Sequence, residues 1–334
     1  MRVMITGGTG FIGYHSALAL LAAGHEVSLL VRSIDKMNQL YGKGVIEHFS
    51  LGDIPDEGQV RRAMQDCDAV LHVAALVSTA ARDADRVYQT NTQGVRNVIG
   101  SAVSRGLPAI HVSSVTALYD ADATGLDEDS PPAANATGYG RSKVACEEYV
   151  RSLQEAGEPV YITYPASVLG PDAPALTEPH EGLKTYIAQF VPIMDSGSQY
   201  VDARDIAEVH RRILEQRPAG NRFMLGGHYL SWSELGEHLE ALTGRELRRL
   251  RLGQRTVKLM AAVCDAVAPW FNVDLPLTKE GATYASNWIM MDSSRVQEQL
   301  DFAFRPVDET LGDSIRWLQQ EGHITAEQAG QLAE

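Results

Sequence analysis

A tyrosine and a lysine four residues apart form the pair with the clearest potential for chemistry in this sequence. Tyr139 and Lys143 stand in the stretch GYGRSKVACEEY, where this spacing puts both side chains on one face of a helix. A free phenol has a pKa near ~10 and is a poor acid or base at neutral pH. A neighbouring ammonium stabilises the phenolate and lowers that pKa, so the pair can exchange a proton with a substrate oxygen. The same spacing is common by chance on helix surfaces, so the rest of the sequence must show whether this pair is functional.

A glycine-rich turn near the start of the chain predicts a phosphate site. In MRVMITGGTGFIG, residues 2–6 are typical of a buried strand and residues 11–23 of a helix. A helix start carries unpaired N–H groups and a partial positive charge, which suit a phosphate. The glycine spacing is close to the dinucleotide fingerprint without matching its G-x-G-x-x-G form, and a tight turn without a ligand is the alternative. The predicted cofactor contacts in this turn are Gly7, Thr9, Gly10, Phe11, Ile12 and Gly13.

The end of the second predicted strand indicates which dinucleotide would bind. The stretch EVSLLVR ends at Arg32, Lys36 follows four residues later, and no Asp or Glu occupies positions 31–33. An acidic side chain there would bind a free ribose, whereas an arginine suits a 2′-phosphate through its forked guanidinium. We therefore expect NADP(H) as the favoured cofactor, contacted by Arg32 and Lys36, with NAD(H) as the other option. A solvated surface arginine is the alternative interpretation.

A pair of serines ends the fifth predicted strand. The stretch AIHVSS ends at Ser113 and Ser114, and in a parallel sheet that end faces the same crevice as the glycine turn. A hydroxyl there could hold a substrate carbonyl beside the tyrosine, or it could cap the next turn. From the residues alone, either serine could hold the substrate carbonyl and either could cap the next turn.

Short apolar runs that alternate with helical patterns surround these residues and predict an α/β fold. Strands separated by helices form right-handed βαβ units, so we expect a Rossmann-type doubly wound parallel sheet with a smaller C-terminal substrate-binding lobe. Residues 1–170 are expected to form the NAD(P)-binding domain and residues 171–334 mainly the lobe, with about 198–226 returning to the sheet. The predicted strands are 2–6, 26–31, 45–49, 69–73, 109–113, 160–164 and 222–225, and the predicted helices include 11–23, 56–64, 85–103, 139–156, 203–216, 231–242 and 310–320.

The composition fits a globular enzyme and argues against some partners. Hydrophobic residues make up 44% and charged residues 22%. A balance of 29 basic and 43 acidic residues gives a net charge of −14, which argues against nucleic acid or an anionic membrane. Cys67, Cys146 and Cys264 show no metal-ligand spacing and, with no signal peptide, predict a reducing cytoplasm and no metal site. No apolar stretch reaches the ~20 residues of a membrane span, and 257–273 is expected to form a core or lid helix, or an interfacial surface.

Taken in order, these motifs resemble the extended short-chain dehydrogenase/reductase family. GGTGFIG, Asp53 in LGDIPD, HVAA at residues 72–75, Asn91 in TNTQGVRN, the Ser-Ser strand end and YGRSK all match its pattern. The likeness runs nearly end to end, through YPASVLGP, VDARDIAE, GNRFMLGG and TLGDSIRWL. Within the family, the sequence is most similar to the dihydroflavonol-reductase and hydroxysteroid-dehydrogenase branch. So many motifs in one order are far more specific than any single motif.

The resemblance implies a role for each matching residue. Ser114 would orient the substrate carbonyl, with Ser113 as the second choice. Tyr139 would be the general acid, and Lys143 would lower its pKa and hold the nicotinamide ribose. His72 is better explained as a buried, hydrogen-bonded imidazole. Further cofactor contacts would be Asp53 and Ile54 at the adenine, Ala74, Ala75 and Leu76 along the cofactor, Asn91 near the strand ends, and Pro165, Ala166, Ser167 and Val168 beside the nicotinamide.

Departures from related enzymes narrow the expected reaction. Dehydratases similar to this family carry an Asp-Glu pair after the strand-five serine or threonine, where this chain has Val115 and Thr116. Epimerases often read R-Y-F-N after strand six, where this chain reads TYPASVLGP and has no asparagine. Tyr164 stands where many relatives have arginine, so the support beneath the nicotinamide could differ. Simple hydride transfer is therefore favoured over elimination or epimerisation.

Three functional hypotheses follow. The leading one is an NADP-dependent carbonyl reductase or alcohol dehydrogenase that acts on a small, fairly apolar substrate through Ser114, Tyr139 and Lys143. Leu76, Val77, Leu118 and the 270–271 region are candidate walls, although a core stripe explains them equally well. The alternatives are an NAD-dependent nucleotide-sugar epimerase and a non-catalytic dinucleotide-sensing regulator. A homodimer through 85–103 and 139–156 is expected from the resemblance.

Overall fold

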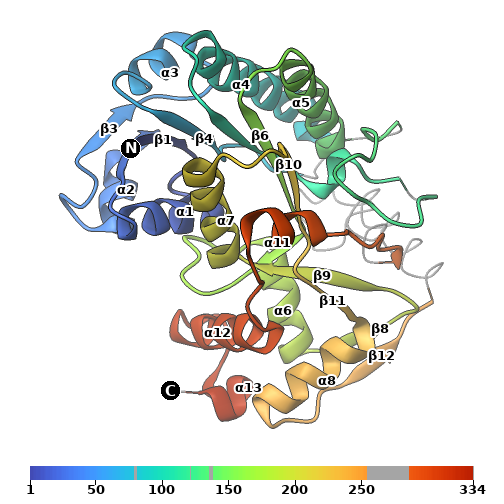
Figure 1. Ribbon diagram of the computed structural model, residues 1–334. Helices are drawn as coiled ribbons and strands as arrows, with labels where there is room; N and C mark the ends of the chain where they lie inside the picture. The colour runs from blue at the N-terminus through green and yellow to red at the C-terminus, as the bar shows by residue number, and fades with distance from the viewer. Residues whose placement is uncertain (79–80, 121, 135–137, 254–285, 334) are drawn as a thin grey trace.

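A seven-stranded sheet forms the larger part of the molecule, and all of its neighbouring strands pair in parallel (Figure 1). The computed structural model describes residues 1–333 except 79–80, 121, 135–137 and 254–285, so the predicted helix 257–273 and the wall at 270–271 lie outside the described residues. The strand order is β10-β6-β5-β4-β1-β2-β3, and the order reverses between β1 and β4, which confirms the doubly wound fold. The strands are β1 (Arg2–Thr6), β2 (Glu26–Val31), β3 (His48–Leu51), β4 (Ala69–His72), β5 (Ala109–Val112), β6 (Val160–Pro165) and β10 (Arg222–Leu225).

Helices cover both faces of this sheet, and side chains alternate between two apolar cores. Val3 and Ile5 of β1 enter one core while Met4 enters the other, because successive side chains of a strand point to opposite faces. The first core receives α1 (Phe11–Ala22), α2 (Ile34–Tyr41) and α7 (Ala203–Gln216). The second receives α3 (Glu57–Ala63), α4 (Ala84–Ser104) and α5 (Gly138–Glu155).

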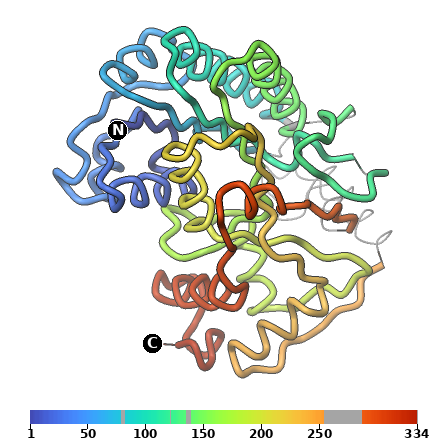
Figure 2. The backbone as a smooth tube through the Cα atoms, in the orientation of Figure 1, coloured from blue at the N-terminus to red at the C-terminus, as the bar shows by residue number. Residues whose placement is uncertain are grey.

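A second, smaller group of elements lies beneath the sheet layer, and the chain crosses between the two more than once (Figure 2). Three strands pair in the order β11-β9-β7 and two more form a β12-β8 pair. In the segment 198–226, α7 packs on α1 and β10 pairs with β6, whereas β9 belongs to the three-stranded sheet. The remaining elements are β7 (Ser167–Leu169), α6 (Glu178–Ala188), β8 (Val191–Ile193), β9 (Gly197–Asp202), β11 (His228–Ser231), α8 (Trp232–Thr243), β12 (Arg249–Arg251), α11 (Ser294–Leu300), α12 (Val307–Gln320) and α13 (Ala326–Ala329).

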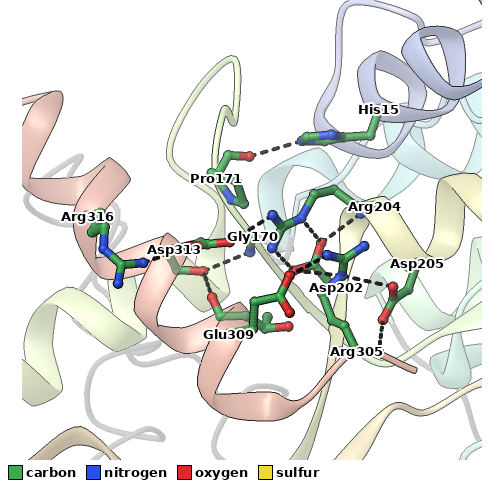
Figure 3. A network of polar contacts seen from close by, with 12 residues as sticks. His15, Gly170, Pro171, Asp202, Arg204, Asp205, Arg305, Glu309, Asp313 and Arg316 are labelled. Carbon is green, nitrogen blue, oxygen red and sulfur yellow. Dashed lines mark hydrogen bonds and ion pairs between the residues drawn. The ribbon is translucent and has the colours of Figure 1, made fainter. Parts of the chain in front are cut away.

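A network of ion pairs joins α12 to the start of α7 (Figure 3). Asp202 caps α7, and its carboxylate accepts two hydrogen bonds from the Arg204 guanidinium, at 2.9 and 2.7 Å. Arg204 also reaches Asp313 of α12 at 2.8 Å. Arg305, just before α12, donates to Asp205 at 2.9 Å. These contacts fix α12 against the element that leads back into the sheet layer.

The third strand begins and ends later than predicted. The sequence predicted residues 45–49, whereas β3 runs from His48 to Leu51. This strand is at the edge of the sheet and pairs only with β2 in the seven-stranded order. Its half-buried residues are the polar His48 and Ser50, so an apolar run does not mark its bounds. Phe49 and Leu51 are both exposed. None of the helices that the structure describes has the length and apolar character needed to cross a membrane.

Candidate active site

The glycine turn lies between β1 and α1, and its three spaced glycines meet different requirements. Gly7 has a φ of +74°, and a β-carbon there would lie 2.7 Å from the backbone nitrogen of Ala74. A β-carbon on Gly13 would lie 2.2 Å from the carbonyl oxygen of Gly7. A β-carbon on Gly10 would meet only that same oxygen, at 3.3 Å. The protein's own packing therefore requires the first and third glycines far more than the second.

The open backbone at Gly10 fits the phosphate of a dinucleotide. Gly10 is the N-cap of α1, no side chain caps this helix start, and its first turn holds no acidic residue. Unpaired N–H groups at a helix start bind anions, and a side chain at this position would occupy the space that a close ligand needs. Gly10 is exposed, Thr9 and Ile12 are half-buried and Phe11 is buried. The residues present thus fit the pyrophosphate of the cofactor.

The residues expected at the adenosine end lie near the ends of β2 and β3. Arg32 and Lys36 are exposed, and neither forms an ion pair with any residue in the described part of the chain. The backbone N–H of Lys36 donates to the Ser33 hydroxyl, which caps α2, a helix whose bounds we did not predict. The carboxylate of Asp53 accepts from the N–H of Ile54 at 2.8 Å. Two cationic side chains are therefore available at the strand end.

Asn91 of α4 fixes the segment that follows β4. Its amide oxygen accepts from the N–H of Leu76 at 2.7 Å, and its amide nitrogen donates to the carbonyl of Leu76 at 3.0 Å. The same nitrogen donates to the hydroxyl of Ser142, which lies in α5 between Tyr139 and Lys143. Ala74, Ala75 and Leu76 are all half-buried. Asn91 thus connects this segment with the helix that carries the tyrosine and the lysine.

The two serines after β5 have different surroundings. Ser113 is buried and donates to the Glu147 carboxylate at 2.9 Å. Ser114 lines a pocket, and its hydroxyl also accepts from the N–H of Thr116 at 3.3 Å. Ser113 is therefore committed to a buried carboxylate, whereas Ser114 caps the next turn and also faces the pocket.

Tyr139 and Lys143 are adjacent, as their spacing predicts. The ammonium nitrogen of Lys143 lies 5.7 Å from the centroid of the Tyr139 ring. It donates to the backbone carbonyls of Val112 and Ser113, at 3.2 and 3.5 Å. Lys143 is buried, and Tyr139 lines the same pocket as Ser114. A buried ammonium beside a phenol is the arrangement that stabilises a phenolate.

Two histidines lie on the same side of the sheet as Lys143. His72 and His111 are buried and stacked, with ring centroids 5.6 Å apart. Burial, followed by the charge of Lys143, lowers the pKa of His72 to about 3 and that of His111 well below its usual value. Nδ1 of His72 lies 2.7 Å from the Thr6 hydroxyl, and the described residues offer no hydrogen-bond partner to Nε2. His72 is thus a buried neutral imidazole, with one of its nitrogens hydrogen-bonded.

Tyr164, the position where the resemblance would put an arginine, is fully buried. Its hydroxyl donates to Glu147 at 2.5 Å, and Arg151 of α5 lies within 2.7 Å of the same carboxylate. Burial and then the negative charge of Glu147 raise the pKa of Tyr164 well above its usual value. The positive charge next to Tyr164 therefore comes from Arg151 on α5, and not from a residue of β6.

The pocket that contains Ser114 and Tyr139 has a volume of about 290 Å³. Of the four positions that the sequence predicts beside the nicotinamide, three line this pocket, namely Pro165, Ala166 and Ser167. The fourth, Val168, is half-buried and packs against the apolar core. The prediction that Leu118 forms a wall of the substrate pocket is wrong. The short turn after Ser114 places Leu118 in the core between the sheet and α5. Among the pocket residues that sequence reasoning missed are Glu178, Pro179, Gly182, Tyr186, Ser198, Tyr200, Trp232 and Trp288.

The model of the NAD dependent epimerase/dehydratase family matches residues 3–226. The chain belongs to this family. The membership confirms the resemblance predicted from the sequence, and the family description supports a dinucleotide cofactor.

Relatives that match along almost the whole chain include enzymes of different names. A Synechocystis protein named "Putative dihydroflavonol 4-reductase" is 26% identical over 334 residues, which cover 96% of this chain and 95% of that protein. Sterol demethylase protein B of Methylococcus capsulatus is 25% identical over 340 residues, which cover 97% of this chain and all of that protein (100%). A solved UDP-glucose 4-epimerase of Stenotrophomonas maltophila, with bound NAD and formylated UDP-arabinopyranose, matches with a TM-score of 0.73 at 20% identity, covering 97% of this chain and 99% of that one. The last similarity shows the fold alone.

Proposed function

We propose that this chain is an NADP(H)-dependent oxidoreductase that transfers a hydride between the nicotinamide and the carbonyl or alcohol carbon of a small, fairly apolar molecule. The observation that carries the proposal is the convergence of Ser114 and Tyr139 on one pocket, with the buried ammonium of Lys143 next to Tyr139. The glycine turn and the family membership support a dinucleotide beside that pocket.

In the direction of reduction, the chain's own residues would handle the charge that develops on oxygen. The bound nicotinamide would supply the hydride. Ser114 and Tyr139 would donate hydrogen bonds to the developing alkoxide, and Tyr139 would transfer its proton to it. Lys143 would stabilise the resulting phenolate by its charge. Ser113 is unsuited to the role of Ser114, because Glu147 already accepts its hydrogen bond.

NADP(H) is proposed over NAD(H) because of Arg32 and Lys36. Both side chains are exposed at the end of β2, and both are without an ion-pair partner in the described residues. A guanidinium and an ammonium at that position suit the doubly charged 2′-phosphate. Asp53 and Ile54 are proposed to border the adenine.

The pocket lining supports a carbonyl substrate over a nucleotide sugar. Among the described residues that line the pocket there is no lysine or arginine to neutralise a diphosphate. Val115 and Thr116 line it where a dehydratase-like pair of carboxylates would be needed. The similarity to an epimerase with bound NAD keeps epimerisation as the second candidate. Purified protein that retains NAD through turnover without net oxidation of the cofactor would support that candidate.

We also propose that the protein forms a homodimer through α4 and α5. Light scattering would measure this assembly.

Turnover by purified Tyr139→Phe protein tests the proposal. A panel of aldehydes, ketones, steroids and sugar nucleotides is followed by NADPH absorbance with the wild type and the variant. The variant should lose at least about a hundredfold in kcat while still binding NADPH, because only the proton donor is removed. Tyr149→Phe, on the same helix but outside the pocket lining, is the matched control and should retain activity. Full activity in Tyr139→Phe would remove Tyr139 from the mechanism, and no turnover by the wild type would favour a dinucleotide sensor.

A further inference from the structure

The part of the pocket that sequence reasoning missed combines aromatic rings with one carboxylate. Tyr186, Tyr200, Trp232 and Trp288 line it together with Glu178. Among the described lining residues, Glu178 is the only one with a formal charge at neutral pH. The pocket therefore offers a ligand apolar ring surface and a single negative charge.

Helix α6 supplies both kinds of group from one face. Glu178, Gly182 and Tyr186 are spaced by four residues, so they follow one another along the helix. A β-carbon on Gly182 would lie 3.3 Å from the Tyr186 hydroxyl oxygen. The Tyr186 side chain thus runs back along the helix toward the turn that carries Glu178, as long helical side chains usually do. The glycine leaves the room that this orientation needs.

Within the described part of the chain, the carboxylate of Glu178 has no protein partner. No hydrogen bond or ion pair involves its side chain among the described residues, although arginines form many pairs elsewhere in the chain. The protein around it raises its pKa by removing part of its solvation. Glu178 is nevertheless exposed by its accessible area, so water reaches its carboxylate in the unliganded protein. A ligand that fills the pocket would displace the water on that side of the carboxylate, and loss of solvation without a new partner is costly for a charge.

Two of the aromatic rings form a corner that could complement such a ligand. The rings of Tyr186 and Trp232 are 5.7 Å apart between centroids and meet at 74°. Tyr200 is buried on the neighbouring strand β9. Aromatic faces attract cations through their quadrupole, most strongly when the cation leaves water. Rings and a free carboxylate in one pocket are complementary to an organic cation.

We propose that the pocket selects a carbonyl substrate that carries a positively charged nitrogen, with Glu178 as its counter-ion and Tyr186 and Trp232 as its aromatic walls. This inference rests on the proposed function, because it names the substrate class of the same site. A neutral apolar substrate would strand the carboxylate without a partner, and an acidic substrate would face charge repulsion. The selectivity therefore depends on the charge of Glu178, not merely on its ability to accept a hydrogen bond.

Two ketones of nearly equal shape test this inference. In 4-acetyl-N,N,N-trimethylanilinium a trimethylammonium group replaces the tert-butyl group of 4-tert-butylacetophenone, so the pair differs mainly by one positive charge and the cation donates no hydrogen bond. Binding to the full-length protein saturated with NADP+ is measured by quenching of tryptophan fluorescence, since Trp232 and Trp288 line the pocket. Glu178→Gln keeps the shape and removes the charge. Glu181→Gln, on the same helix but outside the lining, is the matched control.

The wild type and Glu181→Gln should bind the cationic ketone about tenfold or more tightly than the neutral one, and Glu178→Gln should reduce that preference to about threefold or less. Equal binding of the two ketones by the wild type, or an unchanged preference in Glu178→Gln, would overturn the inference. Turnover of both ketones with NADPH at equal kcat/KM would also overturn the inference of a cation site, but it would leave the proposed reductase function intact. A clear binding preference without turnover of either ketone would instead count against the reductase assignment and support the cation site.

Discussion

Replacing Gly10 by alanine should weaken dinucleotide binding while leaving the unliganded fold almost unchanged. The new β-carbon would contact only the carbonyl oxygen of Gly7, at 3.3 Å, and the extended backbone of Gly10 is available to any residue. A small shift of that oxygen and the change of an N-cap glycine to alanine should together cost roughly 0.5–1 kcal/mol. The methyl group would, however, stand where we expect a phosphate to lie against bare backbone.

Gly13→Ala is the matched control for this prediction. Its β-carbon would lie 2.2 Å from the same carbonyl oxygen and 3.0 Å from the Cα of Gly8, so backbone atoms must move. Overpacking of this kind costs about 1–3 kcal/mol or more. The two variants carry the same added methyl group in the same turn, but only the second should lower the stability of the unliganded protein strongly.

The assay combines thermal unfolding without cofactor and a fluorescence titration with NADPH. Gly10→Ala should melt within about 3 °C of the wild type. Its Kd for NADPH should rise at least about tenfold, which corresponds to about 1.4 kcal/mol. Wild-type affinity in Gly10→Ala would refute the placement of the phosphate at this turn. A loss of stability as large as that of Gly13→Ala would refute the distinction between the two glycines.

The other predictions concern cofactor choice, catalysis and acid stability. Arg32→Ala should raise the Kd for NADPH about tenfold and that for NADH less than about threefold in parallel titrations; equal effects would contradict the NADP(H) proposal. Lys143→Ala should lower kcat at least about a hundredfold and also weaken NADPH binding, because the phenolate and the ribose would both lose a partner. Burial tends to raise the pKa of Asp202, but hydrogen bonds from Arg204 outweigh it and hold the pKa below its usual value. A lowered folded-state pKa adds stability that is fully present above the unfolded value of ~4 and is lost as the pH falls from there through the folded-state pKa. The Tm of the wild type should therefore fall more steeply than that of Asp202→Asn as the pH drops below ~4.

The sheet layer could be predicted from the sequence because its signals are local. The bounds of β1, β2, β10 and α7 agree with the predicted ranges, since each is a continuous apolar run or a periodic helix between turn residues. The bounds of the short helix Ile34–Tyr41 were not predicted. Only Met37 and Tyr41 of its eight residues are buried, which leaves little apolar pattern to detect.

Most of the pocket could not be predicted in this way. Tyr139 and Ser114 follow from motifs whose spacing is visible in the chain. Glu178, Tyr200 and Trp232 come from α6, β9 and α8. Short strands bring these elements together: β11, which precedes α8, pairs with β9, and β8, which contacts both α6 and α8, pairs with β12. Three-residue strands of this kind carry no periodic signal of their own. The aromatic character of the pocket therefore became visible only in three dimensions.

The role of Ser113 could not be decided from the sequence either. Its neighbour Ser114 has the same chemistry, and the difference arises from Glu147, which lies on α5 thirty-four positions away. Alternation along the strand end then directs one hydroxyl to the buried carboxylate and the other to the pocket. A contact across such a separation leaves no trace in local spacing.

A crystal structure of the protein with NADP+ bound tests the central claim most directly. The account predicts that the Tyr139 hydroxyl lies within about 3 Å of the nicotinamide ribose or of a carbonyl ligand held by Ser114, with the ammonium of Lys143 on the same ribose. A bound nicotinamide remote from Tyr139, or a Tyr139 hydroxyl turned to solvent away from Ser114, would contradict it.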